Sequence, residues 1–302
     1  MTNTGTDKAG LVVASFGNRG RLDTGDGSTH RYLLKGRKLR AVCGDRVDWK
    51  PPSYGNELIV TAIHNRDNAL ERPDSRGRPE LVAANLSRLV IVLAPEPTAD
   101  FFIADRYLCA TDLLPAEALI IWNKTDLMAK VPAEIEAYRS LGYALVETST
   151  THQTGITELA DALTTGISML VGQSGVGKSS LINQLIPDAN VAISELSEVS
   201  REGKHTTSAS VMHTLPNGGR LIDSPGVREF APVIRDPTKV QAGFREIIAQ
   251  AADCRFSDCQ HLREPDCAVK AAVESGVLAA RRYESYKRLR HSAAALATAD
   301  TN

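Results

Sequence analysis

The stretch that decides the fold lies in the second half of the chain, where residues 172–180 read GQSGVGKSS. It follows a short apolar run at 167–171 and opens a helical stretch at 180–186 that Pro187 ends. The pattern G-x-x-x-x-G-K-[ST] between a strand and a helix is typical of a phosphate-binding loop, because its glycines let backbone N–H groups converge on phosphate oxygens. We therefore expect a nucleotide to be bound by Gly172, Gln173, Ser174, Gly175, Val176, Gly177, Lys178, Ser179 and Ser180.

Further residues fit the chemistry of a bound nucleoside triphosphate. The Lys178 ammonium suits the β- and γ-phosphate oxygens, and the Ser179 hydroxyl suits Mg²⁺. Asp223-Ser224-Pro225-Gly226 ends an apolar strand. In this D-x-x-G pattern, Asp223 is expected to hold Mg²⁺ through water, and the Gly226 N–H to contact the γ-phosphate.

A second motif predicts which base is bound. Asn123-Lys124-Thr125-Asp126 follows the apolar run 118–122. Asp126 can accept hydrogen bonds from the N1–H and the exocyclic amine of guanine, whereas adenine offers neither and would leave the carboxylate unpaired. Lys124 can pack along the base and ribose, and a backbone N–H in the later stretch that includes Ser149 and Thr150 can bond the guanine O6.

The polar stretch between the phosphate loop and the D-x-x-G motif is expected to be a switch loop. It contains Gly203-Lys204-His205-Thr206-Thr207, and one of Thr206 and Thr207 is expected to coordinate Mg²⁺ when the γ-phosphate is present. Val227 occupies the position after Gly226 where a water-orienting side chain is usual, and valine cannot polarise water. We therefore expect slow intrinsic hydrolysis, with His205 as the candidate that takes over once a partner orders the loop.

The order of the motifs is unusual. In an ordinary GTPase the phosphate loop comes first and N-K-x-D last, but here Asn123 precedes Gly172, and Asp223 closes the series. The same sheet can form only if the chain is circularly permuted, with the strand 89–93 in the place that normally follows D-x-x-G. The chain after Gly226 then leads into the C-terminal region, so the GTP state could move that region directly.

Composition supports three domains. The chain has 302 residues, and its formal net charge of −1 argues against a uniformly basic coat but permits local basic patches. Residues 1–75 read as short strands at 11–16, 31–34, 41–49 and 58–63, which favours a small β-barrel, and a charged linker follows at 71–80. Residues 76–235 alternate apolar runs with amphipathic stretches, the pattern of a parallel α/β sheet, and 236–302 read as helical. No apolar run is long enough for a membrane span, and residues 1–10 lack a signal-peptide core, so we expect a cytoplasmic protein with no membrane partner.

The C-terminal region carries a candidate zinc site. Cys254, Cys259, His261 and Cys267 form C-x₄-C-x-H-x₅-C, and three thiolates with one imidazole can complete a closed tetrahedral site. Free thiols beside a chance histidine are the alternative. Cys43 and Cys109 lie in apolar surroundings and are expected to be buried, inert thiols.

Basic residues concentrate in two places. One is the helical stretch 281–291, whose arginines and two tyrosines suit phosphate contacts and stacking on bases, with a solvated helix as the alternative. The other is the β-rich region, a typical nucleic-acid-binding face if the barrel is an OB-fold. The basic residues of this β-rich region are Arg31, Lys35, Arg37, Lys38, Arg40 and Arg46.

Taken together, GQSGVGKSS, GKHTTS, DSPG, the permuted order, the β-rich start and the Cys/His cluster resemble the RsgA (YjeQ) family of circularly permuted GTPases that depend on the small ribosomal subunit. The resemblance implies an N-terminal OB-fold, a permuted GTPase domain and a C-terminal zinc module with the same four ligands, acting in late maturation of the 30S subunit on 16S rRNA and adjacent ribosomal proteins. Lys204 stands where arginine is usual in the family, and Ser208 where a third threonine is common. The alternative is a signalling-type GTPase that acts through protein partners without ribosome binding. A P-loop ATPase is disfavoured by N-K-T-D, and a monomer is the default oligomeric state.

Overall fold

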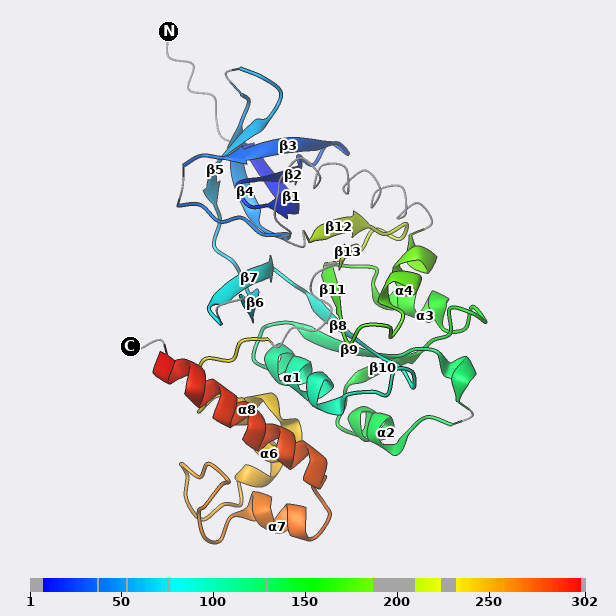
Figure 1. Cartoon of the computed structure of the whole chain (residues 1–302), viewed down its shortest axis with the longest axis vertical. Helices are drawn as coiled ribbons and strands as arrows, with labels where there is room; N and C mark the ends of the chain where they lie inside the picture. Colours follow the sequence, from blue (N-terminus) through cyan, green and yellow to red (C-terminus); the bar gives the residue numbers. More distant parts are fainter. Residues whose placement is uncertain are drawn as a thin grey trace.

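The computed structural model of the chain describes residues 8–36, 38–52, 54–74, 77–128, 130–186, 210–223 and 232–299. Figure 1 shows three parts along the longest axis: a β-barrel beside the N-terminus, a central sheet with helices on both faces, and a helical part at the opposite end. The expected fold class, a barrel followed by an α/β domain and a helical Cys/His region, is confirmed.

Five strands close the barrel. Their order is β1-β2-β3-β5-β4, and β4 pairs back with β1. Alternating side chains such as Tyr32, Val47 and Val60 fill the interior. The strands are β1 (Lys8–Phe16), β2 (Arg19–Asp23), β3 (Thr29–Leu34), β4 (Arg46–Lys50) and β5 (Leu58–Ile63).

Two expectations about this region are wrong. Strand β2 was not predicted, because its only inward positions are Gly20 and Leu22 and its apolar alternation is therefore weak. The predicted linker 71–80 is a two-stranded ribbon, β6 (Ala69–Pro73) and β7 (Pro79–Ala84). The strands were not predicted because they carry many charged residues. Arg72 pairs with Glu80 across the ribbon at 3.1 Å, so these charges make a cross-strand contact and are not simply solvated.

The central sheet has the order β10-β9-β8-β11-β13-β12, and all neighbours are parallel except β12 and β13. Its strands are β8 (Arg88–Leu93), β9 (Glu117–Trp122), β10 (Ala144–Glu147), β11 (Ile167–Val171), β12 (Val211–Thr214) and β13 (Arg220–Asp223). The barrel adjoins it through one residue pair, Ala14 of β1 with Val211 of β12. The strands 88–93 and 117–122 are buried almost throughout, as a sheet covered on both faces requires.

Helices cover both faces of this sheet. On one face, α1 (Phe101–Asp112) and α2 (Ala133–Ser140) bury Tyr107 and Tyr138 against the strands. On the other, α3 (Ile156–Ala162) and α4 (Lys178–Leu185) bury Leu159 and Leu181. A short 3₁₀ turn, η1 (Thr125–Leu127), follows β9.

The sheet confirms the circular permutation. β8 lies directly beside β11, although α1, β9, α2, β10 and α3 separate them in the chain. From β8 the chain proceeds outward to β9 and β10, whereas from β11 it proceeds the other way, to β12 and β13. The neighbouring ends of β8 and β11 therefore form a topological switch point, where the crevice that binds ligands is expected in open α/β sheets.

The C-terminal part is helical. It contains η2 (Val240–Gly243), α6 (Arg245–Ala251), α7 (Ala268–Glu274) and α8 (Ala280–Ala299), and its core includes Phe244, Ile247 and Tyr286. In Figure 1, α8 runs across this part beneath α1. None of the helices in the described ranges is long and apolar enough to cross a membrane.

Candidate nucleotide and metal sites

The phosphate loop follows β11 at the switch point, and two of its glycines are required by close contacts. Gly172 has φ +139°, and a Cβ there would lie 2.3 Å from the Val92 carbonyl oxygen of β8. Gly177 has φ +97°, and a Cβ there would lie 2.3 Å from Asn123 Nδ2. Helix α4 begins at Lys178, so its N-terminal N–H groups face the loop. The Lys178 ammonium donates to the carbonyl oxygens of Gly172 and Gln173, which holds it at the loop.

Asn123 joins the phosphate loop to the base-recognition motif. Its buried side chain donates from Nδ2 to the Val176 carbonyl oxygen at 2.8 Å. Its Oδ1 accepts from the Thr148 hydroxyl at 2.9 Å. One amide thus ties together the ends of β9, β10 and β11. Asn123 is predicted to bind nucleotide, and in the structure it also positions the phosphate loop, a contact between distant segments that a local sequence pattern does not reveal.

The remaining base-motif residues lie close to one another after β9 and β10. Asp126 is exposed, and its Oδ1 accepts a hydrogen bond from the buried Ser149 hydroxyl at 2.5 Å. That hydrogen bond lowers the pKa of the Asp126 carboxyl, so the carboxylate needed to accept from guanine is favoured. The Thr125 N–H donates to the Thr148 carbonyl oxygen at 3.1 Å, and Thr150 follows Ser149 in the same loop.

The loop after β8, residues 94–100, contacts both motifs. Lys124 has a left-handed backbone, with φ 59°, and its Nζ donates to the Glu96 carbonyl oxygen at 2.7 Å. The Gln173 Oε1 accepts from the Asp100 N–H at 2.8 Å. Asp100 in turn caps α1 by accepting from the N–H groups of Phe102 and Ile103. The loop is therefore a third wall of the site, one that the sequence did not signal.

The structure places only part of the predicted magnesium site. Asp223 is the last residue of β13, which runs parallel to β11, so its carboxylate lies at the same edge of the sheet as the phosphate loop. Ser179 and Ser180 are exposed in the first turn of α4. His205, Thr206, Thr207, Gly226 and Val227 lie outside the described residues.

The four predicted zinc ligands come together in the C-terminal part. Their ligand atoms all lie within 4.8 Å of one another. Cys254 Sγ is 3.9 Å from Cys267 Sγ and 3.6 Å from His261 Nδ1, and Cys267 Sγ is 3.5 Å from the same nitrogen. A tetrahedral zinc ion would separate two thiolates by about 3.8 Å, and a thiolate from an imidazole nitrogen by about 3.6 Å. The donor set fits a structural zinc ion held through Nδ1 of His261.

Burial affects the chemistry of this cluster. It raises the pKa of the Cys259 thiol to about 12 and lowers that of His261 in the metal-free protein. A metal ion must therefore displace protons from the thiols, and its affinity is expected to rise with pH.

The two tyrosines of α8 hold the ligand loop. The Tyr283 hydroxyl donates to the His261 carbonyl oxygen at 2.5 Å, and the Tyr286 hydroxyl donates to the Gln260 carbonyl oxygen at 2.8 Å. Both rings are buried. The prediction that they stack on bases is therefore wrong, because the ordering of the ligand loop needs their hydroxyl groups on the inside of the module.

Two arginines of the basic stretch of α8 are also internal, whereas Arg288 is exposed and Arg281 and Lys287 are half-buried. Arg282 is 2% exposed and Arg290 9%, so neither is available as a surface contact. On the barrel, by contrast, the predicted basic residues in the described ranges are exposed: Arg31, Lys35, Lys38, Arg40 and Arg46, whereas Arg37 lies outside those ranges. Cys43 and Cys109 are fully buried, as predicted, and burial raises the pKa of each thiol.

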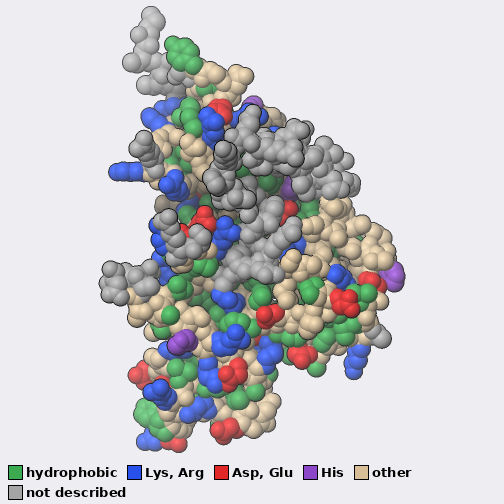
Figure 2. All heavy atoms as spheres, viewed as in Figure 1, with side chains coloured by type: hydrophobic (Ala, Val, Ile, Leu, Met, Phe, Trp, Pro, Cys, Tyr) green, Lys and Arg blue, Asp and Glu red, His purple; other side chains and the backbone are tan. Residues whose placement is uncertain are grey.

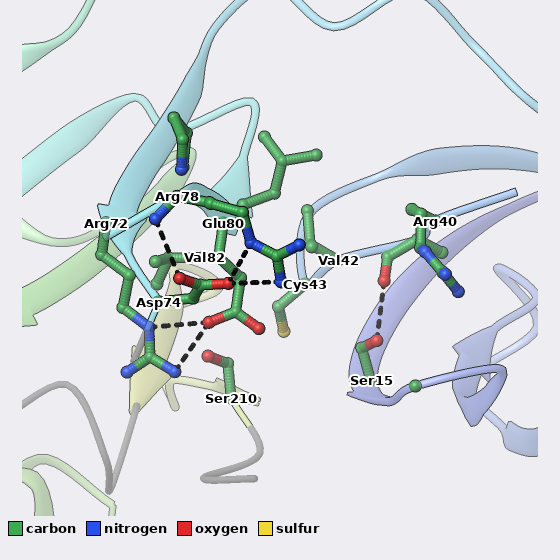
Figure 3. A pocket seen from close by; sticks show the side chains of 14 residues that line it. Ser15, Arg40, Val42, Cys43, Arg72, Asp74, Arg78, Glu80, Val82 and Ser210 are labelled. Atoms are coloured by element: carbon green, nitrogen blue, oxygen red, sulfur yellow. Dashed lines mark hydrogen bonds and ion pairs between the residues drawn. The ribbon is translucent and has the colours of Figure 1, made fainter. Parts of the chain in front are cut away.

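A cleft with a volume of about 690 Å³ opens between the barrel and the β6–β7 ribbon (Figure 3). Two of its arginines are paired within it: Arg72 with Glu80 at 3.1 Å and Arg78 with Asp74 at 2.9 Å. The cleft shares no residue with the phosphate loop or the base motif, and we assign it no part in nucleotide binding.

Comparison with known proteins agrees with this geometry. The RsgA GTPase family model matches residues 63–232. A protein of Chromohalobacter salexigens named small ribosomal subunit biogenesis GTPase RsgA is 40% identical over 293 residues, covering 94% of this chain and 86% of that protein. The protein of the same name from Pseudomonas aeruginosa is 41% identical over 292 residues, covering 94% and 85%.

Solved structures extend the likeness to the whole fold. The crystal structure of YjeQ from Thermotoga maritima superposes with a TM-score of 0.73 at 28% identity, covering 95% of this chain and 98% of that one. YloQ, described as a circularly permuted GTPase, shares the fold with a TM-score of 0.71 at 24% identity, covering 97% of each chain. The chain therefore belongs to the RsgA GTPase family, and it is a GTP-hydrolysing enzyme with a circularly permuted core.

Proposed function

We propose that this chain binds the small (30S) ribosomal subunit through 16S rRNA and adjacent ribosomal proteins, and that it assists late maturation of the subunit in the cytoplasm, as a monomer. In this proposal the subunit stimulates hydrolysis of GTP to GDP and phosphate. The observation that carries it is that relatives named for small-subunit biogenesis match 94–97% of the chain, so the likeness includes both flanking parts as well as the GTPase core.

For the nucleotide, we propose that residues 172–180 bind the phosphates and that residues 123–126 with 149–150 bind guanine. The support is geometric: Asn123 ties the two motifs together, and Lys178 is held at the loop. The Asp126 carboxylate, kept ionised by Ser149, has the acceptor character that the guanine N1–H and amine require.

For the metal ions, Mg²⁺ would be held by Ser179 and Thr207, or by Thr206 in place of Thr207, with Asp223 contacting it through water. It would neutralise charge on the β- and γ-phosphates. Zn²⁺ would be held by Cys254, Cys259, His261 and Cys267, whose separations fit a closed site that leaves no position for catalysis.

For the hydrolytic step, we propose that Gly226 N–H contacts the γ-phosphate and that His205 orients the attacking water after the subunit orders its loop. Val227 cannot do so, since its side chain neither donates nor accepts a hydrogen bond. His205→Ala should reduce subunit-stimulated turnover while leaving the slow intrinsic rate nearly unchanged. Equal stimulated turnover in this variant and the wild type would rule out the role of His205.

Co-sedimentation tests the ribosomal part of the proposal. Small subunits should retain the protein with a non-hydrolysable GTP analogue and release it with GDP, and they should accelerate GTP turnover. Binding that ignores the nucleotide, together with no acceleration, would contradict the proposal and favour a GTPase acting through other partners.

Guanine recognition can be tested separately. Asp126→Asn replaces an acceptor with an amide that cannot serve both guanine donors, and GTP affinity should fall by about 100-fold or more. Xanthosine triphosphate, which carries an oxygen in place of the amine, should bind this variant better than GTP. Asp161→Asn on α3 is the charge-matched control and should bind GTP as the wild type does. Unchanged GTP affinity in Asp126→Asn would refute the assignment.

A further inference from the structure

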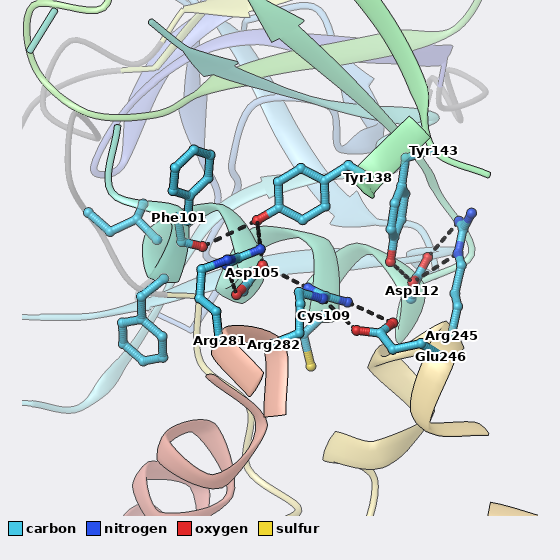
Figure 4. Close-up of polar contacts among 12 residues, drawn as sticks. Phe101, Asp105, Cys109, Asp112, Tyr138, Tyr143, Arg245, Glu246, Arg281 and Arg282 are labelled. Atoms are coloured by element: carbon cyan, nitrogen blue, oxygen red, sulfur yellow. Dashed lines mark hydrogen bonds and ion pairs between the residues drawn. The ribbon is translucent and has the colours of Figure 1, made fainter. Parts of the chain in front are cut away.

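The contact between α1 and the C-terminal part is rich in arginine, and most of these arginines have partners (Figure 4). Arg281 and Arg282 both bond the fully buried Asp105 carboxylate, at 2.6 and 2.8 Å. Arg282 also pairs with Glu246 at 2.5 Å, and Arg245 pairs with Asp112 at 2.9 Å. These arginines already have carboxylate partners, and their ion pairs hold α1 and the C-terminal part together.

Two arginines in the same region differ from the rest. The guanidinium of Arg288, on α8, lies 3.6 Å from the centroid of the Phe102 ring, and that of Arg106, on α1, lies 5.5 Å from it. Neither has a carboxylate or a hydrogen-bonding partner for its guanidinium in the part of the chain that the structure describes, and Arg106 Nε is buried without a partner. We call Arg106 and Arg288 the arginine pair.

The charge of the arginine pair is compensated only in part. Burial, the largest influence, and the like charge of Arg288 lower the pKa of Arg106, whereas Tyr107 and the Asp100 carboxylate act in the opposite direction. The acids near the pair in sequence have other partners: Asp105 bonds Arg281 and Arg282, Asp100 caps α1, and Glu284 pairs with Lys287 at 2.6 Å. Two guanidinium groups held at one ring repel each other. An anion bound between them would therefore lower the electrostatic free energy of the protein.

We propose that Arg106 and Arg288 together hold a phosphodiester group of RNA where α1 meets α8. A guanidinium stacked on an aromatic ring keeps its planar fork free, and that fork matches the geometry of a phosphate. Figure 2 shows Lys and Arg side chains on this face over α1 and α8, with some Asp and Glu side chains among them. The choice of RNA rests on the proposed function, in which the chain binds 16S rRNA, whose backbone is a chain of anionic phosphodiesters.

The position of the arginine pair links the RNA contact to the nucleotide. Arg106 lies on the helix whose first turn is capped by Asp100, and the Asp100 N–H donates to Gln173 of the phosphate loop. Arg288 lies on the helix that holds the zinc ligand loop. A phosphate bound by both would therefore fix α8 against the same helix that the phosphate loop contacts.

The test compares Arg106→Gln, Arg288→Gln and the double variant with wild type. Binding to small subunits is measured with a non-hydrolysable GTP analogue over a series of KCl concentrations, and binding to a protein-free 16S rRNA transcript is measured in parallel. Arg139→Gln is the charge-matched control, since Arg139 on α2 already pairs with Glu136 and Glu147. Thermal melting and GTP turnover without subunits, both expected to be unchanged, verify that the variants are folded.

We expect the double variant to bind subunits and rRNA about tenfold more weakly at low salt, and the slope of log affinity against log salt to decrease by about 0.7–0.9, the value for one phosphate contact. Each single variant should show most of the loss of affinity seen in the double variant, because both arginines hold the same phosphate and their effects are not additive.

Three results would overturn the inference. The double variant could bind both probes with the affinity and salt slope of wild type. It could lose affinity for subunits but not for protein-free rRNA, in which case the partner is an acidic protein surface. The arginines could act additively, which would mean separate contacts. If the wild type itself does not bind subunits, the proposed function fails, and the rRNA measurement still decides the arginine pair.

Discussion

The GTPase core has two junctions, and they are built from different chemistry. On the barrel side, the Ala84 N–H donates to the Cys43 carbonyl oxygen at 3.0 Å, and the Asn85 amide donates to the Gly44 carbonyl oxygen at 2.8 Å. On the C-terminal side, buried charges dominate, with Asp105 and Arg282 almost inaccessible to solvent. The first junction uses backbone groups, neutral amides and one partly exposed ion pair, Arg220 of β13 with Asp23 of β2 at 3.3 Å, whereas the second uses buried ion pairs between side chains.

This difference in contacts indicates which of the two junctions can change its arrangement. Both junctions share a hydrophobic core with the GTPase domain, through Cys43 on the barrel side and Cys109 on the C-terminal side, but the backbone contacts of the barrel junction leave it few alternative arrangements. A junction of ion pairs depends on each partner being present, and it can re-form elsewhere if the helices shift. We therefore expect the C-terminal part, rather than the barrel, to change position with the nucleotide. Four experiments test this contrast.

The largest effect is expected from removing the metal. Chelation, or Cys267→Ser, should unfold the C-terminal part, because structural zinc contributes about 10 kcal/mol to the folding of small domains. Hydrogen exchange in α7 and α8 should then become fast, whereas the barrel and the central sheet stay protected. Restoring zinc to the chelated wild type is the control, and unchanged exchange in α8 after chelation would contradict the assignment.

The next effect is expected at the centre of the ionic junction. Asp105→Ala removes a buried carboxylate that accepts hydrogen bonds from Arg281, Arg282 and Tyr138. It should lower the free energy of unfolding by about 3–5 kcal/mol, measured with urea. Asp112→Ala removes a partner of the more exposed Arg245 and should cost clearly less. Equal losses in the two variants would mean that burial of the charge is unimportant.

A smaller effect is expected at the barrel junction. Gly44 has φ +94°, and a Cβ there would lie 2.0 Å from the Ala84 carbonyl oxygen. Gly44→Ala should therefore cost about 2–3 kcal/mol, through backbone strain and displacement of the junction. Gly25→Ala is the matched control, with φ +81° and open space, and should cost about 1 kcal/mol. Equal melting temperatures of the two variants would show that the barrel junction tolerates displacement.

The smallest effect is expected where the chain passes from the core to the C-terminal part. The Val233 N–H donates to the Glu71 carbonyl oxygen, and Arg235 pairs with the Glu71 carboxylate at 2.7 Å. Because the Arg235 side chain is 51% exposed, Arg235→Ala should cost less than about 1 kcal/mol in urea unfolding. A loss of 3 kcal/mol or more would mean that this link, and not the α1–α8 contact, secures the C-terminal part.

Much of the candidate nucleotide and metal chemistry could be predicted because it depends on short local patterns. GQSGVGKSS, NKTD and the Cys/His spacing each place their residues within one turn or loop, and the structure brings each group together. The order of the motifs was enough to predict the permuted sheet, since strands that carry these motifs have only one workable arrangement. By contrast, β2 was missed because its inward positions include a glycine, and the β6–β7 ribbon was missed because its strands are charged.

The motifs in the sequence were enough to predict the kind of enzyme: a GTP-hydrolysing core with a permuted chain, a barrel before it and a Cys/His cluster after it. The roles of the basic residues of α8, by contrast, became clear only from the fold. Their composition suggested a surface for RNA, but the fold assigns Arg282 to Asp105 and the neighbouring Tyr283 to the ligand loop, and it leaves Arg288 exposed beside Arg106. The physical reason is that an arginine's role depends on which carboxylates and rings the fold brings near it, and those come from parts of the chain far away in sequence.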